Sequence, residues 1–172
     1  LQIEPYVERL MSIYNVFSDG KKPSDVLRIP KLRKVYDAER RATAALLHFY
    51  ESSLSNSFPG VIDAVKNFAR ADAERFRLRD EMRAEAIAKV LREDKYEDKM
   101  VYVEAGSMHS YLEKAIRCKL GRRWNIRSEF LLGSVIKKLT GEKEVIPPGD
   151  LLTTHYILRR KYNEEYETLQ AA

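Results

Sequence analysis

The sequence lacks the features that mark secreted proteins and membrane-spanning proteins. Its 172 residues include one cysteine, Cys118, so the chain cannot form an internal disulfide. The longest apolar stretches, such as residues 42–50, are too short and too interrupted to cross a bilayer. Residues 1–11 hold two Glu and a Pro where a secretion signal would have a basic start and a continuous apolar run. These absences argue against a membrane span and predict a cytoplasmic protein.

The composition is that of an ordinary globular domain, with 44% apolar and 33% charged residues. A chain of this size buries roughly 70% of the surface that its unfolded form exposes, so a core can form without metals or disulfides. We expect Cys118 to be a buried free thiol, because it follows Ala115 and Ile116 in a helical pattern. Residues 1–172 are expected to form a single domain, and the first Met at position 11 predicts a fragment of a slightly longer chain.

Apolar residues recur at steps of three and four along most of the chain, which predicts helices. Proline, glycine and polar breaks between these runs mark where each helix begins and ends. The expected helices cover residues 6–17, 32–51, 61–91, a stretch from about 111, residues 131–139 and, after an Asp150 N-cap, residues up to about 167.

Three other segments have the pattern of strands. Residues 100–105 form a compact run of β-branched and aromatic residues, as in a buried strand. Residues 124–130 alternate between apolar and polar side chains, and the run before Pro5 ends like a short strand. The expected fold is therefore α/β and helix-rich, with a small, mainly parallel sheet and long inserted helices.

The sharpest local motif is Gly106-x-x-His109, which follows the expected strand 100–105 and precedes a helix. The carboxyl ends of strands are where open α/β sheets place their ligands. A neutral imidazole there can act as a base near neutral pH or bind a metal. The alternative is that His109 is a hydrogen-bonded residue of a turn.

Charged residues on the long helix 61–91 form the second candidate. Arg75 and Arg79 share the helical face that includes Met82. A buried guanidinium needs a carboxylate or an anionic ligand, because desolvating it alone costs several kcal/mol. Alternatively, Arg75 extends past its neighbours into water, and Arg83 is interpreted as an ordinary solvated partner on the helix surface.

Together these motifs resemble the superfamily that contains the ChaN haem-binding lipoproteins, the erythromycin esterases and, more distantly, the TraB and Tiki proteins. The motifs are Ile3-Glu4, Arg79-Asp80-x-Met82-x-Ala84 and Gly106-x-x-His109. The resemblance is densest over residues 73–120. It implies that Glu4, Arg79 and His109 converge at one edge of a sheet. The first motif of the family, a strand followed by Gly-Glu-x-His, is not found in residues 1–172, so one His and one acid of the family's site are absent here.

The resemblance implies a catalytic or ligand-binding site. In a hydrolytic version His109 is the base or a metal ligand, Glu4 orients a water or helps to hold the metal, and Arg79 stabilises negative charge. Arg75 and Gly106 are expected to contribute to ligand binding. An alternative is a protein that binds haem or a divalent metal without catalysis. One His and one Glu are too few to specify zinc, so the cofactor is left open.

A different class of function is a basic module that binds nucleic acid. The densest positive stretch comprises Lys114, Arg117, Lys119, Arg122, Arg123 and Arg127, with Trp124 among them, and residues 159–161 add another. The net charge of +5 is modest, and no helix-turn-helix, zinc-finger or RNA-recognition signature is present. These points argue against nucleic acid and favour a solvated basic face.

Other residues give weaker signals. His48 and Glu51 have the spacing of helical metal ligands, and a site built from His48, His109 and His155 is also compatible with the sequence. Ten tyrosines include no single candidate for a haem ligand. The expected partner is a small molecule, and the sequence leaves a homo-oligomer open.

Overall fold

The computed structural model describes residues 3–54, 57–93, 96, 99–141, 148–158 and 164–172. Its secondary structure in these ranges is helical. The elements are α1 (Pro5–Ser18), α2 (Pro23–Leu27), α3 (Pro30–Ser53), α4 (Phe58–Leu91), α5 (Leu112–Leu120), the 3-10 helix η2 (Gly121–Arg123), α6 (Gly133–Thr140), α7 (Pro148–Ile157) and α8 (Glu164–Ala171).

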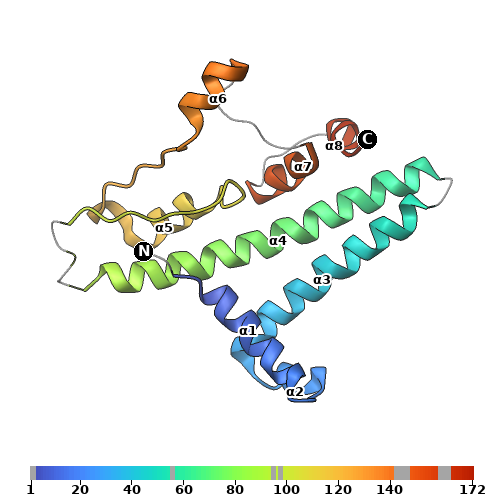
Figure 1. Cartoon of the computed structure of the whole chain (residues 1–172), viewed down its shortest axis with the longest axis horizontal. Coiled ribbons are helices and arrows are strands. Elements are labelled where there is room, and N and C mark those ends of the chain that lie inside the picture. Colours follow the sequence, from blue (N-terminus) through green and yellow to red (C-terminus); the bar gives the residue numbers. More distant parts are fainter. Residues whose placement is uncertain (1–2, 55–56, 94–95, 97–98, 142–147, 159–163) are drawn as a thin grey trace.

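Helix α4 is the axis around which the chain is arranged (Figure 1). Helix α3 runs antiparallel to α4 along one side of it, and α1 and α2 pack at the N-terminal end of α3. Helices α5, α7 and α8 lie on the other side of α4. Helix α6 projects away from the rest of the molecule. One helix of 34 residues therefore contacts segments from both ends of the sequence.

The sequence explains why α4 is long and closely packed. The Ser57 hydroxyl accepts from the Gly60 amide at 3.3 Å, which caps the first turn, and Pro59 fits there because it lacks an N–H. Ala residues recur at its buried positions, and their small side chains let neighbouring helices approach. The buried alanines are Ala64, Ala69, Ala73, Ala84 and Ala88.

Two groups of buried apolar side chains form the core. One lies between α4 and α5 and consists of Ala84, Ile87, Leu91, Leu112, Ala115 and Ile116. The other joins α1, α2 and α3 and consists of Tyr6, Ile13, Val26, Leu32 and Val35. Leu78 and Met82 of α4 pack against the second group, so α4 contributes to both.

The prediction of an α/β fold with a small, mainly parallel sheet is wrong. No strand occurs in the part of the chain that the structure describes, and residues 100–105 and 124–130 have irregular extended backbone. Val101 and Val103 pack on the core beside α5, whereas Tyr102 and Glu104 are exposed. The run at 100–105, expected as a buried strand, is therefore covered on one face only. Of the apolar face expected at 124–130, Trp124 and Ile126 are half-buried and Phe130 is exposed. A sheet also needs a hydrogen-bonded neighbour, which alternation within one segment does not supply.

Most predicted helices are confirmed, with ends that differ by a few residues. The expected last helix from Asp150 to about 167 is two helices, because α7 ends at Ile157 and α8 begins at Glu164.

Cys118 is exposed on α5, so the prediction of a buried thiol is wrong. The basic residues 159–161 lie outside the described residues. Among the described helices, none combines the length and apolar character that a bilayer crossing requires.

The core between α4 and α5 should be sensitive to loss of volume. Ile87 is fully buried there, so Ile87→Ala should lower the free energy of unfolding by about 2–4 kcal/mol. Leu47→Ala on the exposed side of α3 is the matched control and should change it by less than about 0.5 kcal/mol. Urea unfolding measures both. Equal effects would contradict the packing described here.

Candidate functional site on helix α4

Four side chains of α4 project along one stripe of the helix. Phe76, Arg79, Asp80 and Arg83 are spaced by three, four and seven residues, so they lie above one another on the same face. This stripe meets two irregular segments, residues 3–4 before α1 and the loop before α5. The candidate site is formed where these segments contact α4.

Glu4 joins two arginines of the stripe. Its Oε2 accepts from Nε and Nη2 of Arg79 at 3.2 and 3.0 Å, and its Oε1 lies 3.1 Å from Nη1 of Arg83. The Arg83 side chain is 4% exposed, whereas that of Arg79 is 31% exposed. Because a buried guanidinium needs a compensating charge, Glu4 holds the N-terminal segment against α4.

Asp80 contacts the imidazole of His109. Oδ1 of Asp80 is within hydrogen-bond reach of Nδ1 of His109, and the Asp80 side chain is fully buried. The His109 side chain is 7% exposed, and the Phe76 ring meets it edge-on with ring centroids 5.9 Å apart. A carboxylate at Nδ1 favours the tautomer with its proton on Nδ1, which makes Nε2 the basic atom.

Backbone contacts fix the loop that carries His109. The His109 amide donates to the Gly106 carbonyl at 3.0 Å, and the His109 carbonyl accepts from the Leu112 amide at 3.1 Å, where α5 begins. Nη2 of Arg83 donates to the Glu104 carbonyl. Arg83 therefore ties both the His109 loop and the Glu4 segment to one turn of α4.

Two buried atoms of this stripe have no hydrogen-bond partner within the described ranges. They are Oδ2 of Asp80 and Nε of Arg83, which lie one turn apart on α4. Buried polar atoms in proteins are nearly always paired, so unpaired ones call for an explanation. One of these atoms is a hydrogen-bond acceptor and the other a donor, and both belong to the stripe that carries the Asp80–His109 contact.

The structure brings the residues of the sequence hypothesis into one region, though not at a sheet edge. Glu4 pairs with Arg79, and His109 contacts the residue that follows Arg79 in the sequence. Asp80 was given no role by the sequence. The interpretation of Arg83 as solvated is wrong, since it is buried in the site. The sequence did hold a signal for the position of Arg83, because its spacing of four residues from Arg79 puts both side chains on one face of the helix.

Arg75, which we expected to bind ligand, is paired within the chain. Its Nη2 lies 2.6 Å from Oδ1 of Asp72, and its Nη1 lies 3.6 Å from Oε1 of Glu39. Glu39 in turn accepts from the Tyr6 hydroxyl at 2.8 Å. Burial and the contacts with Glu39 raise the pKa of Tyr6 above its ordinary range. This cluster ties α1 and α3 to α4.

Gly106 does not need to be glycine for conformational reasons. A Cβ at this position would meet no heavy atom within 4 Å, and the backbone is not in the left-handed region. The expected role of Gly106 was a tight exit from a strand, and that reason disappears with the strand. Its observed role is the carbonyl that accepts from the His109 amide.

A metal site built from several side chains of this region is not seen among the described residues. No three His, Cys, Asp or Glu side chains among them are grouped closely enough to hold a metal. His48, His109 and His155 are therefore not assembled into a site, and His48 pairs instead with Glu51 at 3.9 Å on the surface of α3. His109 could supply one ligand through Nε2, but the Glu4 carboxylate is engaged by two arginines.

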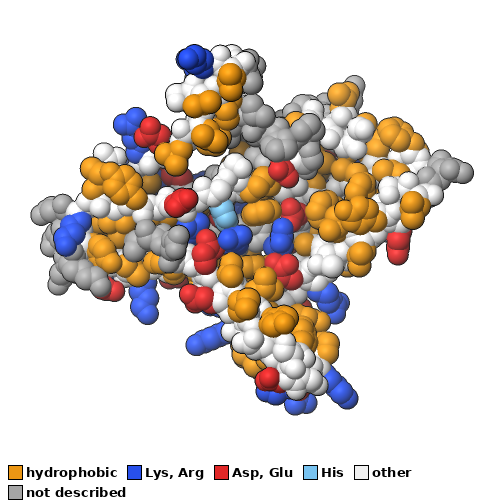
Figure 2. Space-filling view, viewed as in Figure 1, with side chains coloured by type: hydrophobic (Ala, Val, Ile, Leu, Met, Phe, Trp, Pro, Cys, Tyr) orange, Lys and Arg blue, Asp and Glu red, His pale blue; other side chains and the backbone are white. Residues whose placement is uncertain are grey.

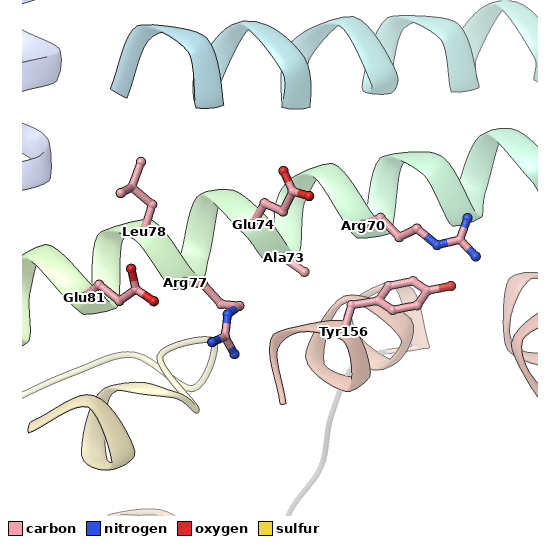
Figure 3. A pocket seen from close by; sticks show the side chains of 7 residues that line it. All are labelled: Arg70, Ala73, Glu74, Arg77, Leu78, Glu81 and Tyr156. Carbon is pink, nitrogen blue, oxygen red and sulfur yellow. The ribbon is translucent and has the colours of Figure 1, made fainter. Parts of the chain in front are cut away.

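A cleft of about 360 Å³ lies on a neighbouring stripe of α4, beside α7 (Figure 3). It is lined by Arg70, Ala73, Glu74, Arg77, Leu78, Glu81 and Tyr156. Arg77 donates to the Ile157 carbonyl at 2.6 Å and lies over the Tyr111 ring. Arg70 pairs with Glu167 at 2.9 Å. These arginines hold the C-terminal helices and the Tyr111 loop on α4.

The surface over the middle of α4 carries charges of both signs. Figure 2 shows Lys or Arg and Asp or Glu side chains gathered there around a histidine, with apolar side chains on either side. In this part of the structure the ion pairs of α4 join opposite charges, among them Arg79 with Glu4 and Arg75 with Asp72.

Comparison with known proteins adds little about function. No protein-family model matches this chain, and no solved structure matches it. An uncharacterised protein of Archaeoglobus fulgidus is 29% identical to the chain over 157 residues, which cover 91% of the chain and 47% of that protein. The chain therefore spans about half the length of this relative.

The Glu4–Arg83 pair should behave as a coupled unit in stability measurements. Glu4→Gln should lower the free energy of unfolding by about 2–3 kcal/mol, because Arg83 keeps its charge in a buried position. The double variant Glu4→Gln/Arg83→Met should recover most of this loss. Glu51→Gln, at an exposed position of α3, is the control. If the separate effects of Glu4→Gln and Arg83→Met on the free energy of unfolding add up to the effect of the double variant, the pair is not coupled.

Asp72 should make the fold less stable as pH rises. Burial raises the pKa of Asp72 above its ordinary value of 3.8, and the Arg75 pair only partly offsets this. The folded state therefore binds the proton more tightly than the unfolded state, so ionisation above about pH 4 opposes folding. The stability of the wild type relative to Asp72→Asn should fall as pH rises from 3.5 to 7, in urea unfolding at each pH. A relative stability that rises instead would show that Arg75 outweighs burial.

Proposed function

We propose that the chain carries a hydrolytic acid–base site in which His109 is the general base. The observation that supports it is the buried Asp80–His109 contact beside the cations Arg79 and Arg83. Asp80 orients the imidazole and stabilises its protonated form, so that Nε2 can take a proton from a water or a hydroxyl group. Phe76 limits rotation of the ring.

The arginines supply the second requirement of such a site, which is stabilisation of negative charge. Arg79 contacts Glu4 through Nε and Nη2 and is the more exposed of the two cations. Because solvent reaches its side chain, the proposal assigns to Arg79 the stabilisation of an anionic group that forms during the reaction. Arg83 is buried and acts as a positioning residue, because it holds Glu4 and the carbonyl of Glu104. Glu4 is likewise a positioning residue.

The resemblance to the ChaN and erythromycin esterase superfamily stays a prediction. It assigned function to Glu4, Arg79 and His109, and the proximity of these residues supports a shared site. The resemblance also implied an α/β fold, and the described residues form helices without a sheet, which argues against the resemblance. The alternative of a protein that binds haem or a divalent metal also stays a prediction, and the acid–base steps proposed here are written for His109, Asp80 and the arginines alone. A cytoplasmic location likewise stays a prediction.

Hydrolysis of chromogenic p-nitrophenyl carboxylate and phosphate esters at neutral pH tests the proposal. His109→Gln should lower kcat by about 100-fold to 10,000-fold, the usual contribution of a general base. Asp80→Asn should also lower kcat and should change the pH profile, because it alters the stabilisation of the imidazolium. His48→Gln, on the surface of α3, is the matched control and should leave kcat unchanged.

Circular dichroism of each variant shows whether the fold is kept, and His109→Asn serves as a second variant if His109→Gln unfolds. The proposal fails if the wild type hydrolyses none of these esters faster than the His109 variants. It also fails if His48→Gln loses as much activity as His109→Gln.

A further inference from the structure

We propose that α6 and the basic segment before it dock on an anionic lipid surface as a peripheral membrane anchor. This inference is independent of the hydrolytic site, because α6 projects away from α4 (Figure 1). It rests on the apolar stripe of α6, on the distribution of charge along the chain and on the size of the stripe.

Helix α6 carries an apolar stripe that the protein does not cover. Leu132, Val135 and Leu139 are spaced by three, four and seven residues and therefore share one face. All three are exposed, Leu139 by 78%, and the preceding Leu131 is 82% exposed. In Figure 2 apolar side chains cover the projecting element, with a basic side chain at its tip. Apolar exposure of this kind marks a surface that contacts another molecule or a membrane.

The charge of the protein is concentrated in the same region. Residues 112–140 hold eight Lys or Arg and two Glu, a net charge of +6, whereas the remainder of the chain has a net charge of −1. Lys137 and Lys138 flank the polar side of α6, and both are exposed. Arg122, Arg123 and Arg127 are exposed in the segment that leads to it. Cations beside an apolar stripe are the pattern of helices that lie in the interface of anionic membranes.

The size and chemistry of the stripe favour lipid over other partners. An eight-residue helix is about 12 Å long, which is too short for the roughly 800 Å² that each partner buries in a stable protein interface. Nucleic acid would use the cations and would leave the leucines in water. A bilayer accepts both, since the leucines enter the acyl boundary while the lysines reach the lipid phosphates.

Co-sedimentation with phosphatidylcholine vesicles, with and without phosphatidylserine, tests this inference. The wild type should bind the vesicles that contain phosphatidylserine, and added salt should weaken the binding. Val135→Ser/Leu139→Ser should lower the partition coefficient at least about tenfold, because two apolar side chains no longer enter the membrane. Lys137→Glu/Lys138→Glu should lower it by about 20-fold or more.

Matched controls come from α3 and its C-cap residue Leu54. Leu47 and Leu54 are also exposed apolar residues, and Lys31 and Lys34 are also exposed lysines. The corresponding Ser and Glu double variants should bind as the wild type does. Failure of the wild type to bind anionic vesicles at low salt overturns the inference.

Two other results also overturn the inference. In the first, the wild type and Val135→Ser/Leu139→Ser bind a single-stranded oligonucleotide equally well, and the two proteins also bind anionic vesicles equally well. In the second, the wild type elutes as a dimer in size-exclusion chromatography and does not bind vesicles, whereas Val135→Ser/Leu139→Ser elutes as a monomer.

Discussion

The burial of charge on α4 is the constraint on which the arrangement of the molecule depends. Lys66, Asp72, Asp80 and Arg83 all lie on this helix and are buried. A charge that leaves water must be paired, and each pair here involves a different part of the structure. Lys66 donates to Thr168 of α8, and Arg83 holds Glu4. Asp72 pairs with Arg75, which also contacts Glu39 of α3. Asp80 contacts His109 in the loop before α5. The helix thus acts as a scaffold whose buried charges fix which segments surround it.

The sequence predicted the helices and part of this constraint. Periodicity located α1, α3 and α4 because their apolar stripes depend only on local spacing. The need of arginines on α4 for acidic partners was also predictable, whereas Glu4 was placed near Arg79 only by the family resemblance, and the two form an ion pair. Which carboxylate meets which cation depends on distant segments, so Arg83 and Asp80 were missed. Arg75 shows the same limit, because its partners Asp72 and Glu39 were not identified from spacing.

The error in fold class has a definite physical origin. Residues 101–104 alternate between half-buried and exposed side chains, and so do residues 124–127. Their apolar members pack on the core formed by α4 and α5. An extended segment that lies on a helical core gives the same period of two as a strand with one apolar face. The difference lies in the backbone hydrogen bonds to a neighbouring strand, which side-chain patterning does not encode.

Two buried atoms that have no partner among the described residues set the candidate site apart from the ion pairs around Arg75. An ion network that served stability alone would be expected to pair every buried polar atom, because each unpaired one costs free energy. Arg75 is close to that case, since two carboxylates surround it. The stripe at Asp80 and Arg83 is different, with Oδ2 and Nε lacking partners in the described part of the chain. Proteins tolerate such cost where a group must serve a ligand or a reaction. The buried atoms beside the Asp80–His109 contact are therefore the features that the proposed function accounts for and that packing alone leaves unexplained.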